Sequence, residues 1–452
     1  MKKVFAMILT LCMMLSMLSV TAFASNAEAA TEAATEAATE TATEAATEAT
    51  TAGSSEEPPA KGTVLRVRGQ KGDKKIVKIQ DYDNFENGWN AAMEYAIGDT
   101  YIHIFVDFYA DWKATDGEFT QKFWNGKGFN WDAIYFQPGV YMTINLNGHT
   151  IDRGLTKWEH NGEVMYIDSR AHVTINGGKD ENDPQTGKIT GGFSCNGAGG
   201  IHVNSNADLT LNNVNIDGNK VEDDDGAGIA IYSGATLIMN GGSIANNLAY
   251  ESNLGCGIYV ENGDATLNNV LISGNKTYTD YVGRGSVTSG GAGYVSNGKL
   301  TLEGCTVKDN HSDRLGGAFG IMFGEIIIRN CTVTQNSAGI DGSVVAIEIG
   351  TCTIEESNVT GNFNTKYDSV FFMDKGTLNI SNSDYDPYIR KFNGTLTITD
   401  SRENSTTADS APTAGSIFTA GSIPVIVSIA ALATAAATIC VVLISKKKKQ
   451  HQ

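Results

Sequence analysis

The stretch LTLNNVNIDGN, residues 209–219, decides the fold, because versions of it return through the middle of the chain. Each version is a β-rich run that ends on an asparagine. The ending asparagines are separated by 28, 28, 35, 26 and 26 residues, and they are Asn219, Asn247, Asn275, Asn310, Asn336 and Asn362. Self-similarity at a period of roughly 20–50 residues is typical of solenoids, in which each repeat is one stacked unit. A strand-only repeat of this length predicts one coil of a parallel β-helix.

Elementary backbone geometry explains how such a coil forms. Alternation such as Leu300-Thr301-Leu302 places every second side chain inside. Coils stack about 4.8 Å apart, so that backbone N–H and C=O groups pair between coils. Glycine and asparagine gather where the chain turns, because both tolerate positive φ. An inward asparagine at one turn of every coil can bond its stacked copies, so we expect the six asparagines to form a structural amide ladder.

One phrase of the sequence resembles a known family. Residues 143–151, TINLNGHTI, are similar to the N-G-H-T phrase that often opens β-solenoids of bacterial surface proteins. Together with the repeat, the chain resembles the right-handed parallel β-helix superfamily, the pectate-lyase-like solenoids, over about residues 140–400. The resemblance implies the fold, and it implies activity only weakly, since such folds host unrelated functions.

Both ends of the chain carry targeting signals. Lys2 and Lys3, the apolar run 4–20 and an A-x-A site predict a signal peptide over residues 1–24. Residues 423–445 form an apolar segment long enough to span a bilayer, and the basic tail 446–452 should stay cytoplasmic. We therefore expect an extracellular solenoid on the membrane of a Gram-positive-type bacterium. The stretch 411–415 has the order of a wall-sorting motif, but it lacks the leucine and the scissile threonine, so membrane anchoring is favoured over sortase attachment.

The remaining segments divide the chain further. Residues 25–62 are a low-complexity acidic spacer of Thr, Glu and Ala, and residues 401–422 read as a second spacer. In residues 63–139 we expect a hairpin, a helix over 84–97 and a strand over 101–112, which together cap the solenoid. We predict an all-β chain: a right-handed parallel β-helix solenoid over 140–400 with an N-terminal α/β cap and a C-terminal transmembrane helix.

Charge and cysteine content limit the partners. The formal net charge is −18, and residues 26–60 contribute eight acids and no base. An acidic chain is a poor partner for nucleic acid, whereas neutral glycans or calcium remain compatible ligands. Cys305 and Cys331 hold the same place in consecutive coils and should pack inward as thiols, although a disulfide between them stays open. No C-x-x-C pair supports a zinc site.

Loops that follow the ladder asparagines should leave the solenoid on one side and form a rim. Functional groups concentrate on loops that a rigid scaffold holds. The weak catalytic candidates on this rim are Asp225, Glu251, Asp280, Arg284 and Arg314. A calcium site is conceivable at Asp223, Asp224 and Asp225, since hard cations prefer several carboxylate oxygens.

Aromatic residues supply the candidate binding groups. The loop 122–131 interleaves aromatic and polar residues, which suits the apolar face and the hydroxyls of a sugar. An outward row with His202, Tyr259 and Tyr294 could line a polysaccharide groove, although Ala230 interrupts it. The ligand-binding candidates are Trp124, Phe129, Trp131, Tyr259, Tyr281 and Tyr294.

The leading function is binding: a surface adhesin or glycan-binding module, with an extracellular glycan or a host or neighbour surface molecule as partner. The alternative is a polysaccharide lyase or glycoside hydrolase, and a second alternative is a structural surface-layer component. The family's lyase and polygalacturonase motifs are missing from the sequence, as are H-E-x-x-H, G-x-S-x-G and a P-loop. The sequence therefore leans against an enzyme, and it requires no cofactor.

Overall fold

A computed structural model describes residues 58–71, 75–98, 102–114, 121–122, 128–129, 133–251, 254–278 and 290–404. The predicted signal peptide, both spacers over most of their length, the membrane span at 423–445 and the basic tail lie outside these residues. Within them, no helix is both long and apolar enough to cross a membrane.

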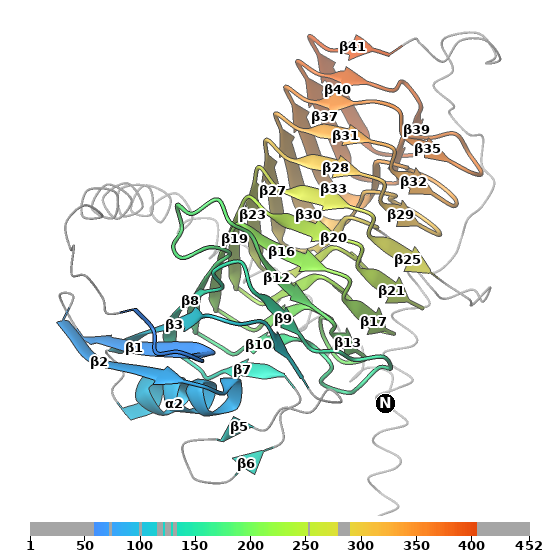
Figure 1. Cartoon of the computed structure of the whole chain (residues 1–452). Helices are drawn as coiled ribbons and strands as arrows, with labels where there is room; N and C mark the ends of the chain where they lie inside the picture. The colour runs from blue at the N-terminus through green and yellow to red at the C-terminus, as the bar shows by residue number, and fades with distance from the viewer. Residues whose placement is uncertain are drawn as a thin grey trace, which may run out of the picture. The chain divides into compact units, whose positions relative to one another are not determined.

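The complete coils in the middle of the described chain have four strands each, and the strands of successive coils pair in parallel (Figure 1). One representative coil contains β18 (Ile229–Tyr232), β19 (Thr236–Asn240), β20 (Ser243–Ala245) and β21 (Leu248–Tyr250). Its strands align without a register shift on those of the following coil. This arrangement is a parallel β-helix, as the repeat predicts.

The strands form four rows along the solenoid. The first row comprises β7 (Ile134–Phe136), β10 (Met165–Ile167), β14 (Ile201–Val203), β18, β22 (Ile258–Glu261), β26 (Gly293–Ser296), β36 (Phe371–Met373) and β39 (Ile389–Lys391). The second row comprises β8 (Tyr141–Asn145), β11 (His172–Asn176), β15 (Asp208–Asn212), β19, β23 (Asp264–Asn268), β27 (Lys299–Glu303), β37 (Thr377–Ser381) and β40 (Thr395–Thr399). In two coils the first two strands fuse, as β30 (Phe319–Arg329) and β33 (Val345–Glu355).

The third and fourth rows form separate sheets. The third row comprises β4 (Trp112–Lys113), β9 (Thr150–Asp152), β12 (Gly187–Thr190), β16 (Val214–Asp217), β20, β24 (Leu271–Ser273), β28 (Thr306–Lys308), β31 (Thr332–Thr334), β34 (Asn358–Val359), β38 (Asp384–Tyr385) and β41 (Arg402–Glu403). The fourth row comprises β13 (Phe193–Ser194), β17 (Lys220–Glu222), β21, β25 (Lys276–Tyr278), β29 (His311–Ser312), β32 (Ser337–Ala338) and β35 (Phe363–Asn364).

The predicted amide ladder is confirmed at the turn between the third and fourth rows. In the row from Asn219 to Asn362, Nδ2 of every asparagine except the last donates to Oδ1 of the asparagine in the next coil at 2.9–3.2 Å. The same Nδ2 atoms also donate to backbone carbonyls at 2.8–3.3 Å. Five of the six side chains are fully buried, and the Asp386 carboxylate ends the row by accepting from the Asn362 N–H at 3.2 Å. Buried amides are therefore satisfied on every side.

A second asparagine ladder, which the spacing of the repeat does not predict, ends the second row of strands. Its members bond through Nδ2 and Oδ1 at 2.8–2.9 Å, and they are Asn145, Asn176, Asn212, Asn240 and Asn268. The ladder begins at Asp107, whose carboxylate accepts from Asn145 at 2.6 Å and pairs with Arg68 at 2.9 Å. It therefore connects residues 65–113 to the coils that follow.

The N-terminal segment contains the predicted hairpin, helix and strand. β1 (Leu65–Lys71) pairs antiparallel with β2 (Lys75–Tyr82) and with β3 (Ile102–Phe108), and β3 continues into the solenoid by pairing in parallel with β8. α2 (Phe85–Gly98) begins after Asn84, whose Oδ1 accepts from the Asn87 N–H at 3.1 Å. A two-stranded hairpin of β5 (Gln121–Lys122) and β6 (Gly128–Phe129) follows.

Aromatic residues of α2 pack beneath the first coil. Trp89 is fully buried, with its ring 5.1 Å from that of Phe136 in the first-row strand β7, and Phe85 stacks on Trp112 at 4.3 Å. Trp158, by contrast, is 52% exposed and takes no part in this packing. Trp124 and Trp131 lie outside the described residues.

Cys305 and Cys331 are buried free thiols in consecutive coils, as the inward-packing prediction requires. The Cys305 N–H donates to Sγ of Cys331 at 3.3 Å. In the next coil, Ser357 takes the same place and accepts from the Cys331 N–H at 3.1 Å. The two thiols thus belong to a row of inward polar atoms that accept backbone N–H groups.

Candidate functional site

The rim loops join the fourth row of strands to the first row of the next coil, so they do leave the solenoid on one side (Figure 1). In several coils the loop ends on a positive-φ glycine before the first-row strand, namely Gly226, Gly255, Gly290, Gly316 and Gly342. Three rim candidates, Asp280, Tyr281 and Arg284, lie in residues 279–289, outside the described part of the chain.

Two rim carboxylates accept hydrogen bonds from backbone N–H groups of nearby residues. Asp224 accepts from the Gly197 N–H and from the Asp225 N–H, at 2.5 and 2.7 Å. Asp225 accepts from the Leu254 N–H at 2.5 Å. Burial raises the pKa of Asp225 to about 7, and the neighbouring carboxylates add to that shift. Among the residues that the structure describes, there is no group of three or more His, Cys, Asp or Glu side chains that could hold a metal ion.

The other described rim candidates do not gather around Asp225. Glu251 is an exposed turn residue at φ 64°, and its N–H donates to the Tyr278 carbonyl at 2.8 Å. Arg314 lies next to Leu315, which is three coils along from Asp225, or about 14 Å at 4.8 Å per coil. Because an acid–base pair must converge on one bond, Asp225 and Arg314 do not form one catalytic site.

The aromatic row on the outer face of the first strands is continuous, contrary to the expected break at Ala230. Neighbouring ring centroids lie 4.5–6.2 Å apart in the column Tyr135, Tyr166, His202, Tyr232, Tyr259 and Tyr294. Tyr232 comes from two residues further along β18 and fills the gap over Ala230.

The two rings of this outer-face column that the sequence assigns to ligand binding are covered by neighbouring side chains rather than open to a ligand. Tyr259 and Tyr294 are 6% and 2% exposed, in a cluster with Leu254 of a rim loop and Met322. Burial lowers the pKa of His202 to about 4, so its imidazole is neutral at pH 7. Since most ring faces in the column stack on another ring, the sequence-based assignment of Tyr259 and Tyr294 to glycan contact is not supported by their positions.

The aromatic loop 122–131 remains a prediction. Phe129 lies in β6, but its side chain and the residues Trp124 and Trp131 are outside the described part of the structure.

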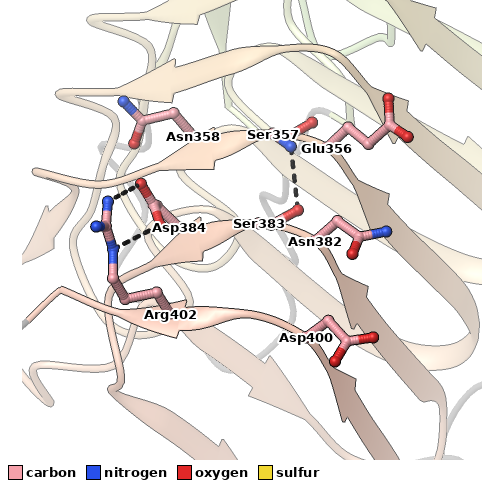
Figure 2. Close-up of a pocket in the computed structure, with 8 residues that line it drawn as sticks. All are labelled: Glu356, Ser357, Asn358, Asn382, Ser383, Asp384, Asp400 and Arg402. Atoms are coloured by element: carbon pink, nitrogen blue, oxygen red, sulfur yellow. Dashed lines mark hydrogen bonds and ion pairs between the residues drawn. The ribbon is translucent and has the colours of Figure 1, made fainter.

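The last coils carry a polar groove on the side of the third row (Figure 2). Its volume is about 330 Å³, and its lining residues are Glu356, Ser357, Asn358, Asn382, Ser383, Asp384, Asp400 and Arg402. Figure 2 shows Arg402 in a two-point contact with Asp384, at 3.0 and 2.6 Å, and Ser357 donating its N–H to the Ser383 hydroxyl at 3.0 Å. All of these lining residues have polar side chains, so the groove offers hydrogen-bond partners for hydroxyl groups but no aromatic or aliphatic side chain on which a sugar ring could pack.

A second feature of the last coils combines exposed rings with a fixed cation. Arg390 of β39 places its guanidinium 4.2 Å from the ring centroid of Tyr367 and 5.2 Å from that of Phe392. Its Nη1 lies 2.6 Å from Oδ2 of the buried Asp341. Tyr367 is 46% exposed and Phe392 is 39% exposed, and Phe372 supports Phe392 edge-on at 5.8 Å. We call these five residues the arginine–aromatic cluster.

The electrostatics of the cluster fix the arginine in place. The Asp341 carboxylate also accepts from the Gly342 N–H at 3.1 Å and from the Ser369 hydroxyl. Burial raises the pKa of Asp341 to about 6, against the opposing effect of Arg390. Because Asp341 binds one side of the Arg390 guanidinium, the rings of Tyr367 and Phe392 and the remaining N–H groups of the guanidinium lie in a defined geometry.

Sequence reasoning missed this cluster. Asp341 and Arg390 are 49 residues apart, and Arg390 reaches past an intervening coil to bond it. One signal was present: the stretch YDPYIRKFNG, residues 385–394, concentrates aromatic and basic residues in a coil of only 18 residues between paired strands.

Residues 199–391 match the family model described as right handed beta helix region. No curated protein and no solved structure matches the chain. The chain therefore contains a right-handed β-helix, and the parallel sheets described above agree with that assignment.

Proposed function

We propose that this right-handed β-helix is displayed outside the cell, anchored by its C-terminal apolar segment, and binds extracellular glycans through the arginine–aromatic cluster. One observation carries the proposal. Two exposed rings, Tyr367 and Phe392, flank a guanidinium that the buried Asp341 holds in place.

This combination suits a sugar. The face of a pyranose ring that carries C–H groups packs on aromatic rings, and an arginine presents planar N–H donors to hydroxyl or carboxylate oxygens. A rigid stack of coils holds these groups without a large ordering cost on binding. The net charge of −18 disfavours nucleic acid as the partner.

The experiment is a glycan array probed with the purified full chain in detergent, followed by affinity measurements on each glycan that binds. Tyr367→Ala and Phe392→Ala should each weaken binding about tenfold or more, which corresponds to about 1.4 kcal/mol. The matched control is Tyr141→Ala, which removes an equally exposed ring (46%) from the second row near the other end of the solenoid.

A purely structural role for the cluster predicts a different pattern. If the rings only shield the last coils, both substitutions would lower the unfolding temperature and leave glycan affinity unchanged. That result, or an array without a single specific ligand, would overturn the proposal.

A further inference from the structure

Three polar side chains on the outer face of the fourth row form a hydrogen-bonded relay. His311 of β29 and Ser337 of β32 lie opposite each other in adjacent parallel strands. His311 Nδ1 lies 2.8 Å from Ser337 Oγ, and His311 Nε2 lies 2.9 Å from Oδ1 of Asp313. None of these residues belongs to the arginine–aromatic cluster.

The relay fixes the tautomer of the imidazole. The Asp313 carboxylate can only accept, so Nε2 of a neutral His311 carries the hydrogen and Nδ1 presents its lone pair to the Ser337 hydroxyl. A hydroxyl within hydrogen-bond reach of a base, with the base oriented by a third group, is the arrangement of an activated nucleophile.

The relay is also accessible from solvent. The side chains of His311 and Asp313 are 27% and 29% exposed. The next residue in the outward row is Phe363, which is 57% exposed, and the preceding one is Lys276. An apolar ring beside the hydroxyl gives a small acyl group a surface on which to pack.

We propose that Ser337 is the nucleophile of an acyl-ester hydrolase site, with His311 as general base and Asp313 as the positioning residue. Ser337 Oγ attacks the ester carbonyl while its proton passes to Nδ1 of His311. The C–O bond to the alcohol then breaks, and the alcohol leaves with that proton. Water repeats the sequence on the acyl-enzyme, so one ester and one water give one acid and one alcohol. The substrate class is an O-acyl ester with a small acyl group, which the Phe363 ring beside Ser337 can contact.

The first test treats the full chain with a biotinylated fluorophosphonate. The probe should form a P–O bond to Ser337 and release fluoride together with the hydroxyl proton, and peptide mass spectrometry would locate the label. Labelling should vanish in Ser337→Ala and fall about a hundredfold in His311→Gln, the size expected for loss of a general base. The control is Ser243→Ala, because the Ser243 hydroxyl is bonded to Asn215 at 2.9 Å instead of to a histidine.

The second test measures hydrolysis of p-nitrophenyl acetate by the same variants. Asp313→Asn should lower kcat with little change in KM, since it disturbs the tautomer of His311 and not the acyl surface, and Asp313→Glu should recover part of the rate. Ser337→Ala removes a single oxygen from a half-buried residue, so an unchanged unfolding temperature would show that its loss of activity is not a loss of fold. Equal labelling of Ser337 and Ser243, or equal rates in the wild type and Ser337→Ala, would overturn the proposal, and neither outcome bears on glycan binding.

Discussion

Replacing Asn275 with leucine tests the amide ladder where it is fully buried. The two side chains have the same number of heavy atoms, so the change removes hydrogen bonds without opening a cavity. Asn275 makes four such bonds: Oδ1 accepts from the N–H and the Nδ2 of Asn247, and Nδ2 donates to the Ile244 carbonyl and to Oδ1 of Asn310.

The expected loss of stability depends on which hydrogen bonds the partners of Asn275 retain after the substitution. The Asn247 N–H loses its acceptor, which costs about 1–3 kcal/mol for a buried donor, whereas the Asn247 Nδ2 keeps the Ile216 carbonyl and Asn310 keeps the Asn275 N–H. The other lost bonds are worth about 1 kcal/mol each, and the buried leucine offsets part of this sum. We expect a net loss of about 2–4 kcal/mol.

The matched control is Asn379→Leu, on the outer face of β37. The same outward row holds Ile238 and Ile327 in other coils, so an aliphatic side chain is already accepted there. Asn262 and Asn297 are unsuitable controls, because both have φ near 54° and leucine would be strained in that conformation.

The assay is urea unfolding of the full chain, followed by circular dichroism. The midpoint for Asn275→Leu should fall clearly with an unchanged m-value, while the midpoint for Asn379→Leu should stay within the equivalent of about 0.5 kcal/mol. Equal midpoints for the two variants would refute the reasoning that the ladder stabilises the solenoid through satisfied buried amides.

Three further predictions concern charge, chemistry and topology. The pKa of Asp225 in the folded state is raised to about 7, so the folded state binds a proton more readily than the unfolded chain between about pH 4 and 7. The free energy of unfolding should therefore fall as pH rises through that window, by up to about 1.4 kcal/mol per pH unit. Asp225→Asn should flatten this dependence in unfolding measurements at pH 5 and 8, and an unchanged profile would contradict the burial effect. Glycosidic bonds of pectin, polygalacturonate and host glycans should not be cleaved, with or without calcium, because Asp225 and Arg314 lie coils apart; a reducing-sugar or unsaturated-product signal that both Asp225→Asn and Arg314→Ala abolish would disprove this. Protease added to intact cells should remove the solenoid and leave a short fragment with the lysine tail, as the apolar segment 423–445 predicts, whereas a protected solenoid would exclude surface display.

Local sequence reasoning succeeds where one residue type repeats with one role. The six asparagines ending each repeat mark the coil length because only a small amide fits the turn and bonds its copies above and below. The helix α2 is equally local: Asn84 caps it, and its apolar spacing puts Phe85, Trp89 and Met93 on one buried face.

Local sequence reasoning fails where the role of a residue changes between coils. The second ladder ends at Asn268, and Glu303 takes the same position in the next coil, so a search for one repeating residue does not reveal this ladder. Tyr232 fills the gap over Ala230 from another position of its strand, and only the packed structure shows that the ring is long enough to do so.

Periodicity along the chain is therefore enough to predict the solenoid, its coil length and its inward and outward faces, and composition predicts the export and anchoring signals, because none of these depends on which distant residues meet. Only the tertiary structure decided which outward residues meet. Arg390 meets Asp341 and Tyr367, and His311 meets Ser337, because stacking brings residues 23–49 positions apart into contact, and side-chain length then selects the partners.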